Sequence, residues 1–224
     1  FISWDGGRNW SPFQLNLPVT PITDLRVHRG NLIASTSGRS FWILDDLSVL
    51  RQYKKEMPAF SIYQPAGAYL ANGGSELNGS DPDFSGSSRF TGVNPANGVV
   101  LYYNLPELKK EDKITLEVKD AEGNAVRTLS SQPDRTYRRW DGGPPPEPVL
   151  PKAKGLNRFV WDMRYPNMPG VSGVYIEASY RGHKAIPGKY KITLTYGTQK
   201  VTTQAEILPN PLYPTTAAQY KEYH

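Results

Sequence analysis

The sequence predicts an all-β protein, and three observations support this fold class. The 224 residues include 20 Gly, 20 Pro and 14 Tyr, a composition that favours strands and turns over long helices. Apolar and polar residues alternate along several short segments, as expected of strands with one buried face. Residues typical of turns separate these segments. Hydrophobic residues make up 38% of the chain and charged residues 21%, which indicates a folded globular protein rather than a disordered one.

Residues 1–52 are predicted to form short strands joined by tight turns. Arg29-Gly30 and Gly38 supply the turn signals. An antiparallel meander of this kind is the unit from which β-propeller blades are built. We therefore expect residues 1–52 to be the closing strands of a propeller, with individual strands at 22–27, 31–36 and 40–44.

Residues 53–96 differ in composition and are predicted to be an extended connector followed by a Gly/Ser-rich loop. The stretch 72–92 is dense in Gly, Ser, Asn and Asp, and it cannot bury enough apolar surface to form a core. Within it, Asp81–Gly86 matches the first half of a calcium-binding loop. The twelfth position is Gly92 instead of a bidentate Glu, so we interpret the segment as a polar loop.

Residues 97–209 return to the alternating pattern and are predicted to form a second domain. Residues 190–196 and 201–207 flank the Gly197-Thr198 turn and predict a hairpin at its end. Short antiparallel strands in this number are typical of an immunoglobulin-like or fibronectin type III-like β-sandwich. Residues 210–224 are predicted to be a tail with a short helix near 216–223. Further strands of the sandwich are expected at 99–103, 114–119, 125–130, 156–163 and 174–178.

The sharpest local motif is Ser3-Trp4-Asp5-Gly6-Gly7-Arg8-Asn9-Trp10. It resembles the Asp-box, Ser-x-Asp-x-Gly-x-x-Trp, with Ser3, Asp5, Gly7 and Trp10 at the four defining positions. An Asp side chain accepts backbone N–H bonds within such a turn, Gly supplies a positive φ, and the aromatic ring packs beneath the hairpin. The resemblance implies a structural role for these four residues, away from any catalytic centre.

A wider resemblance supports the same organisation. Residues 10–52 look like the closing stretch of the bacterial sortilin-like Asp-box (BNR-repeat) propeller proteins, which are often described as glycosyl hydrolases. Residues 155–164 and 187–190 are similar to the carboxy-terminal domain of that family, which in turn resembles the immunoglobulin-like module of flagellar hook-capping proteins. The resemblance implies an exported bacterial protein, periplasmic, secreted or at the cell surface. Its missing amino-terminal propeller would be the partner of this chain.

No catalytic centre, metal site or cofactor is predicted from the residues present. The absence of Cys excludes disulfides, thiolate metal sites and a Cys nucleophile. His28, His183 and His224 lack metal-binding spacing and an accompanying nucleophile elbow, so we interpret them as surface residues. A glycosidase needs two carboxylates facing each other across a sugar. Asp45 and Asp46 would face opposite sides of a strand, or would have a structural role if one of them caps a short helical turn through Leu50. Asp162 is expected to point to solvent or to an Arg.

The charge distribution and the hydropathy of the chain exclude two classes of partner, nucleic acids and a membrane-spanning environment. The net charge of +5 is spread along the chain, whereas a nucleic-acid surface gathers its Lys and Arg on one face, so no nucleic-acid partner is predicted. No apolar run approaches the roughly 20 residues that a membrane span needs.

Two classes of function remain open. In the first, the chain is a non-catalytic accessory or structural module that closes a propeller and adds a sandwich. In the second, it contributes to a glycoside hydrolase or a glycan-binding cleft, with carbohydrate as a partner. Aromatic rings stack on sugars, so the second class points to Tyr137, Arg138, Arg139 and Trp140 as glycan contacts. The alternative role for Trp140, which the sequence favours, is to cover one end of the sandwich core.

Overall fold

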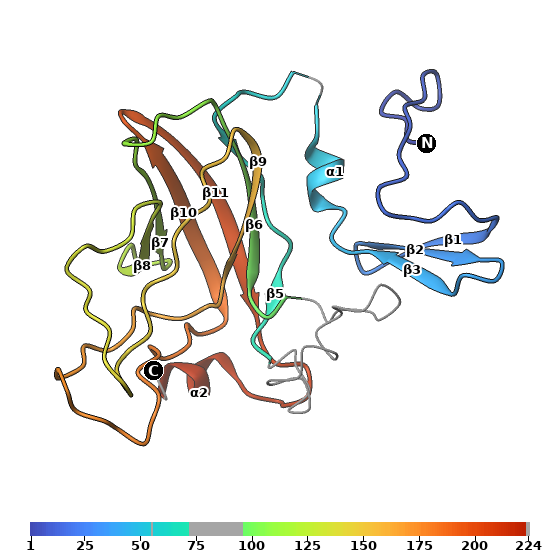
Figure 1. Cartoon of the computed structure of the whole chain (residues 1–224). Coiled ribbons are helices and arrows are strands. Elements are labelled where there is room, and N and C mark those ends of the chain that lie inside the picture. Colours follow the sequence, from blue (N-terminus) through green and yellow to red (C-terminus); the bar gives the residue numbers. More distant parts are fainter. Residues whose placement is uncertain (55, 72–95, 223–224) are drawn as a thin grey trace. The chain divides into compact units, whose positions relative to one another are not determined.

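The structure, a computed structural model, describes residues 1–54, 56–71 and 96–222. The chain forms two compact units, Phe1–Leu47 and Ser48–His224, which Figure 1 colours along the sequence. Strands dominate both units, and the helices α1 (Ser48–Gln52) and α2 (Ala217–Glu222) are short. The predicted all-β class is confirmed. No helix in the described ranges is long and apolar enough to cross a membrane.

The first unit contains a three-stranded antiparallel sheet. Its strands are β1 (Ile22–His28), β2 (Asn31–Thr36) and β3 (Phe41–Leu44), in the order β1-β2-β3. Arg29 and Gly30 both have positive φ and make the tight turn between β1 and β2, as the sequence predicts. A separate hairpin precedes this sheet, closed by reciprocal backbone hydrogen bonds of 2.9 Å between Ile2 and Ser11.

The second unit is a sandwich of two sheets. All strand pairs are antiparallel except the short parallel pair of β5 with β11. The smaller sheet has the order β4-β6-β9, with β4 at Ser61–Ile62, β6 at Val99–Leu105 and β9 at Gly155–Trp161. The larger sheet has the order β5-β11-β10-β7-β8, with β5 at Ala68–Tyr69, β7 at Ile114–Lys119, β8 at Ala125–Ser130, β10 at Gly188–Tyr196 and β11 at Gln199–Leu208.

One hydrophobic core fills the space between the two sheets. Alternate residues of β6, β7 and β10 point into it, which is the period-two pattern that the sequence shows. Trp161 from the smaller sheet and Tyr190 from the larger sheet meet edge to face, with ring centroids 5.5 Å apart. The side chains with no exposed surface at all are Val99, Leu101, Tyr103, Ile114, Leu116, Val118, Met163, Ala185, Ile192 and Leu194.

The strand order is that of an immunoglobulin-like fold. Strands β4, β6 and β9 take the places of strands A, B and E, while β8, β7, β10 and β11 take those of C′, C, F and G. Near the start of β10, the Tyr190 hydroxyl donates a hydrogen bond of 2.6 Å to the backbone carbonyl of Ile186. This is the tyrosine corner that marks strand F of such sandwiches.

The structure differs from the sequence prediction in two segments of the sandwich. Residues 174–178 are not a strand but part of an irregular loop, and they pair with no strand in the described part of the chain. The predicted connector contributes β4 and β5, which pair with β6 and β11, so the sandwich begins well before residue 97. The calcium-like segment 81–86 lies outside the described residues.

Candidate functional site

Two long loops interlock at one end of the sandwich. The first joins β8 to β9 (residues 131–154) and the second joins β9 to β10 (residues 162–187). Figure 1 shows both loops, in yellow and orange, extending beyond the sheets at the same end. Neither has regular structure, so side chains and single backbone bonds must hold their shape.

The buried side chain of Arg127 ties both loops to the sheet. Arg127 lies on β8 and is 4% exposed. One of its terminal nitrogens donates to the carboxylate of Glu147 in the first loop, and the other donates to the backbone carbonyl of Tyr165 in the second. The second oxygen of Glu147 accepts the backbone N–H of Asn167 at 3.1 Å. One charge-assisted network therefore positions both loops.

Trp140 forms a second link between the loops. Its indole packs so closely on Gly143 that a Cβ there would lie 2.6 Å from the ring, and the ring also contacts Gly170 of the second loop. The indole N–H donates to the carbonyl of Val174 at 3.3 Å. Tyr137 supports the same turn, since its hydroxyl donates to the Pro144 carbonyl at 2.8 Å.

A hollow of about 330 Å³ lies between the two loops. Tyr175 forms one wall, and its ring occupies the space that a Cβ on Gly142 would need. Gly142 also has a φ of +72°, so both its conformation and its contact with Tyr175 require glycine here. The lining residues are Gly142, Gly143, Pro145, Tyr175, Ile176, Glu177, Ala178, Ser179, Tyr180 and Arg181.

The hollow combines aromatic surface with charged and hydroxyl groups. Tyr175 is 70% exposed, whereas Tyr180 is 8% exposed. Glu177 and Arg181 are both exposed, and no ion pair joins either of them to another residue in the described part of the chain. The Ser179 hydroxyl accepts the backbone N–H of Arg181 at 3.2 Å. These groups remain available to a ligand.

The four predicted glycan contacts have different surroundings in the structure. Tyr137 and Trp140 are half-buried and shape the first loop. Arg138 and Arg139 are exposed, and Arg138 donates to the carbonyls of Arg135 and Tyr137. The favoured role for Trp140 is wrong, because it packs among the loops and not against the sandwich core. None of the four lines the hollow.

The lining of the hollow was not predicted from the sequence. The alternation in residues 174–178 predicts a strand, and Ser179–Arg181 carry no motif. The sequence feature that could have indicated this lining is the pair of tyrosines, Tyr175 and Tyr180, close to Gly182. It indicates a site only once Gly142 is seen to contact Tyr175 from the other loop.

The hairpin that carries the Asp-box-like motif is held by a network of side-chain bonds. The Ser3 hydroxyl donates to Asp5 at 2.9 Å and accepts the Gly7 backbone N–H at 2.8 Å. Asp5 also accepts the backbone N–H of Asn9 at 2.9 Å and its side-chain amide at 2.6 Å. These bonds to Asn9, together with the Ser3 hydroxyl, lower the pKa of Asp5 to about 2.

Trp10 completes this hairpin by turning back over it. Its indole N–H donates to the carbonyl of Gly7 at 2.9 Å, and Gly7 has a φ of +88°. The ring contacts the hairpin on one side and is 62% exposed. The other side of the ring is therefore open to a neighbouring element.

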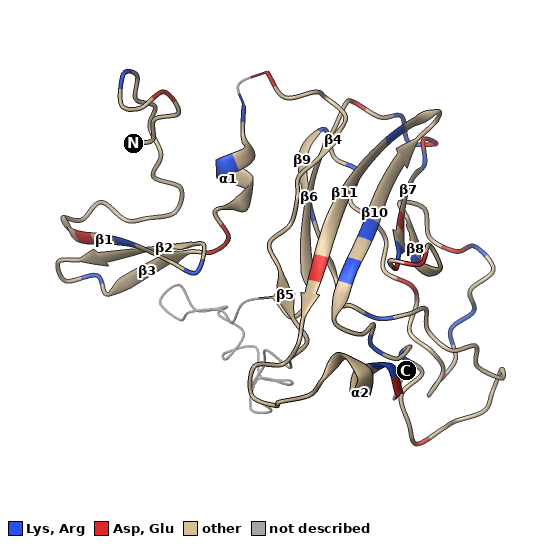
Figure 2. Cartoon of the chain, turned by 180° about the vertical axis from the view of Figure 1, so that it is seen from behind, with Lys and Arg blue, Asp and Glu red and all other residues tan. Residues whose placement is uncertain are grey.

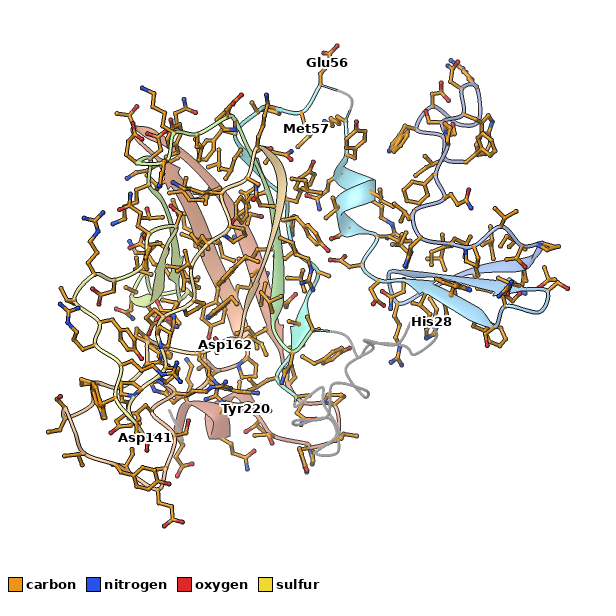
Figure 3. The ribbon with its side chains drawn as sticks, viewed as in Figure 1. His28, Glu56, Met57, Asp141, Asp162 and Tyr220 are labelled. Atoms are coloured by element: carbon orange, nitrogen blue, oxygen red, sulfur yellow. The ribbon has the colours of Figure 1, made fainter. Side chains whose placement is uncertain are left out.

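The remaining titratable residues do not assemble into a reaction centre within the described ranges. Asp141 lies at the outer end of the loops and Asp162 closer to the sheets, so these carboxylates lie apart (Figure 3). Asp162 accepts the backbone N–H of Arg164 at 3.2 Å. His28 and His183 are exposed, and His183 stacks on Tyr165 with ring centroids 4.1 Å apart. No group of three His, Asp or Glu residues suited to a metal ion occurs in the described part.

Basic residues are distributed over the fold. Figure 2 shows Lys and Arg on α1, on several strands and on the end loops, with Asp and Glu between them. This pattern differs from the single basic face of a nucleic-acid surface.

Comparisons with known proteins identify no relative. A scan against the models of known protein families found no match, and searches of curated proteins and of solved structures found none either.

Proposed function

We propose that this chain is a non-catalytic accessory and structural module of an Asp-box propeller protein that resembles the bacterial sortilin-like family. In this proposal, the sheet β1-β2-β3 belongs to a propeller blade and the sandwich is an immunoglobulin-like module that follows it. The partner is the amino-terminal propeller of the same protein, which is exported to the periplasm or the cell surface. The observation that supports the proposal is the apolar surface on the sheet of the first unit.

One face of this sheet is mostly apolar. Side chains of directly paired residues lie on the same face of a sheet. The pairing of β1 with β2 and of β2 with β3 therefore groups six apolar side chains, yet Leu25 is 57% exposed and Val27 is 58% exposed. The apolar face, as named here, consists of Leu25, Val27, Leu32, Ala34, Trp42 and Leu44, and Thr36 lies on the same side at the end of β2.

The opposite face also carries exposed apolar side chains. Ile33, Phe41 and Ile43 lie there beside polar residues, and Phe41 and Ile43 are 74% and 60% exposed. Ala34 is the single buried hydrophobic residue of the whole unit. Asp24, Arg26 and His28 make the β1 part of this opposite face polar, so the first face is the one that lacks a covering sheet, such as a neighbouring propeller blade provides. A surface of this kind marks an interface rather than a solvent-exposed face.

A substitution on the apolar face tests the proposal. Val27→Asp should leave the stability of the 224-residue chain nearly unchanged, because the side chain is already exposed. In a longer form that includes the preceding propeller, the same change buries a carboxylate against the next blade. We expect it to lower the free energy of unfolding there by roughly 2–4 kcal/mol. Urea denaturation of both forms measures the difference.

Arg26→Ala is the matched control, because Arg26 is the neighbouring residue on the opposite face and is paired with Asp24 in solvent. It should have little effect in either form. An equally small effect of Val27→Asp in both forms would show that no blade covers this face. Glycosidase turnover by the 224-residue chain itself would contradict the non-catalytic assignment and favour the carbohydrate-active alternative.

A further inference from the structure

The hollow between the end loops has no part in the structural role proposed above. We propose that it is a carbohydrate-binding site that takes a single sugar ring, stacked on Tyr175 and hydrogen-bonded by Glu177, Tyr180 and Arg181. This site goes beyond the accessory role of the chain and does not depend on it. It also differs from the Tyr137–Trp140 segment that the sequence indicates.

The size of the hollow suits a small ligand. Its volume of about 330 Å³ lies near the lower limit of ligand pockets, which span about 300–1,000 Å³. A helix or a folded segment of a partner does not fit between the loops. One ring of a larger molecule does, with the rest of that molecule extending into solvent.

Tyr175 provides a rigid apolar platform. One side of its ring is held against Gly142, and the side chain is still 70% exposed. The contact restricts the ring before any ligand arrives, so little conformational entropy is lost on binding. An exposed, fixed phenol ring is suited to the C–H face of a sugar, which is apolar although the rim of the sugar is polar.

The polar lining matches the rim of a sugar. Each sugar hydroxyl is both a donor and an acceptor, so it needs partners of both kinds. The Glu177 carboxylate accepts, the Arg181 guanidinium donates, and the Tyr180 hydroxyl can do either. Tyr180 is more than nine-tenths buried, and its hydroxyl makes no hydrogen bond within the described part of the chain. Hydrogen bonds from charged groups to hydroxyls are the strong ones.

The same groups disfavour other small ligands. A phosphate would be attracted by Arg181 but repelled by Glu177. A divalent cation would find Glu177 as the single carboxylate in the lining, and it would be repelled by Arg181. A neutral polyhydroxylated ring satisfies both charges without conflict.

The two loops hold the site in place before binding. Arg127 and Glu147 fix the first loop to the second, and Trp140 bonds to Val174 directly beside Tyr175. Binding sites supported in this way keep their geometry without the ligand.

A glycan array probed with the labelled 224-residue chain tests the proposal. The soluble oligosaccharide with the strongest signal is then titrated by calorimetry against the chain and its variants. Tyr175→Ala should weaken binding by about tenfold or more, because it removes the platform without disturbing a buried side chain. Glu177→Gln should weaken binding while keeping the shape of the lining.

Tyr213→Ala is the matched control, because Tyr213 is also a largely exposed tyrosine (64%) but does not line the hollow. Its affinity should equal that of the unchanged chain. The proposal is overturned if no glycan on the array binds, if Tyr175→Ala binds as tightly as the unchanged chain, or if Tyr213→Ala loses affinity to the same extent. Binding that Glu177→Gln leaves intact would also contradict the assigned hydrogen bonds.

Discussion

At the scale of single residues, Asp5 holds the shape of the amino-terminal hairpin, residues 2–11. Its carboxylate accepts two hydrogen bonds from Asn9 and one from Ser3, which lowers its pKa from 3.8 to about 2. The charged form is therefore favoured in the folded hairpin. The stability that these bonds contribute is fully present above the unfolded pKa, near 3.8, and is lost as the pH falls through about 2. We expect the Asn9 amide proton resonance to titrate with a midpoint near pH 2.

Asp5→Asn is the control for this titration. The variant cannot ionise at position 5, so the Asn9 resonance should stay constant between pH 5 and the midpoint. A midpoint near 3.8 in the unchanged chain would mean that the carboxylate is not bonded to Asn9 in solution. The motif Ser3–Trp10 indicates a tight turn because the side-chain bonds that hold this turn are local, within four residues.

At the scale of elements, a bulge in β8 explains why the sequence pattern does not predict the loop anchor, the buried Arg127 with its partner Glu147. Val118 pairs with Arg127 but Lys119 pairs with Ala125, so Val126 is an extra residue. The bulge buries Val126 and Arg127 in succession. Strict alternation would have placed one of these two outside. The clean alternation of β7 and β10, which have no bulge between them, was predicted correctly.

The pairing of β5 with β11 was also not predictable from the sequence. These partners are far apart in sequence, and β5 is two residues long. A strand this short has no period to detect, so its residues looked like a connector. The hollow was not predicted either, because its lining comes from two irregular loops, which have no periodic pattern and are brought together only by tertiary contacts.

The loop anchor predicts an asymmetry between its two members. Glu147→Ala leaves the guanidinium of Arg127 buried, 4% exposed, without its carboxylate. We expect a loss of about 3 kcal/mol of unfolding free energy, the low end for a broken buried pair. Arg127→Met removes the buried charge itself and leaves Glu147, 42% exposed, to be hydrated. Its cost should be smaller. Urea denaturation followed by far-ultraviolet circular dichroism measures both.

Glu206→Ala provides the comparison for this pair, because Glu206 is an exposed residue of β11 that has no ion pair in the described part of the chain. It should change the unfolding free energy by less than about 0.5 kcal/mol. If Arg127→Met cost more than Glu147→Ala, the loops would depend on the packing of Arg127 and not on its charge.

At the scale of the whole molecule, the two units differ in how much apolar surface they bury. The first unit, Phe1–Leu47, buries one hydrophobic side chain, Ala34. The second contains a continuous core that includes Trp161 and Leu194. The strand content of both units was predicted from the sequence. The difference in buried apolar surface between the units was not predicted, because a strand shows the same alternation of apolar and polar residues whether or not another sheet covers its apolar face.

This imbalance predicts that the units unfold separately. Leu194→Ala opens a cavity in the sandwich, where Leu194 has no exposed surface, and should cost about 2–5 kcal/mol. The thermal transition of the sandwich should fall accordingly, while the Asn9 amide signal of the first unit keeps its own temperature dependence. Asp5→Ala should do the reverse, loosening the hairpin around Asn9 and leaving the sandwich transition unchanged. Nuclear magnetic resonance spectra recorded through the transition follow both units at once. A sandwich transition that shifted equally in both variants would show that the chain unfolds as one cooperative unit, because a substitution in one of two independent units leaves the stability of the other unchanged.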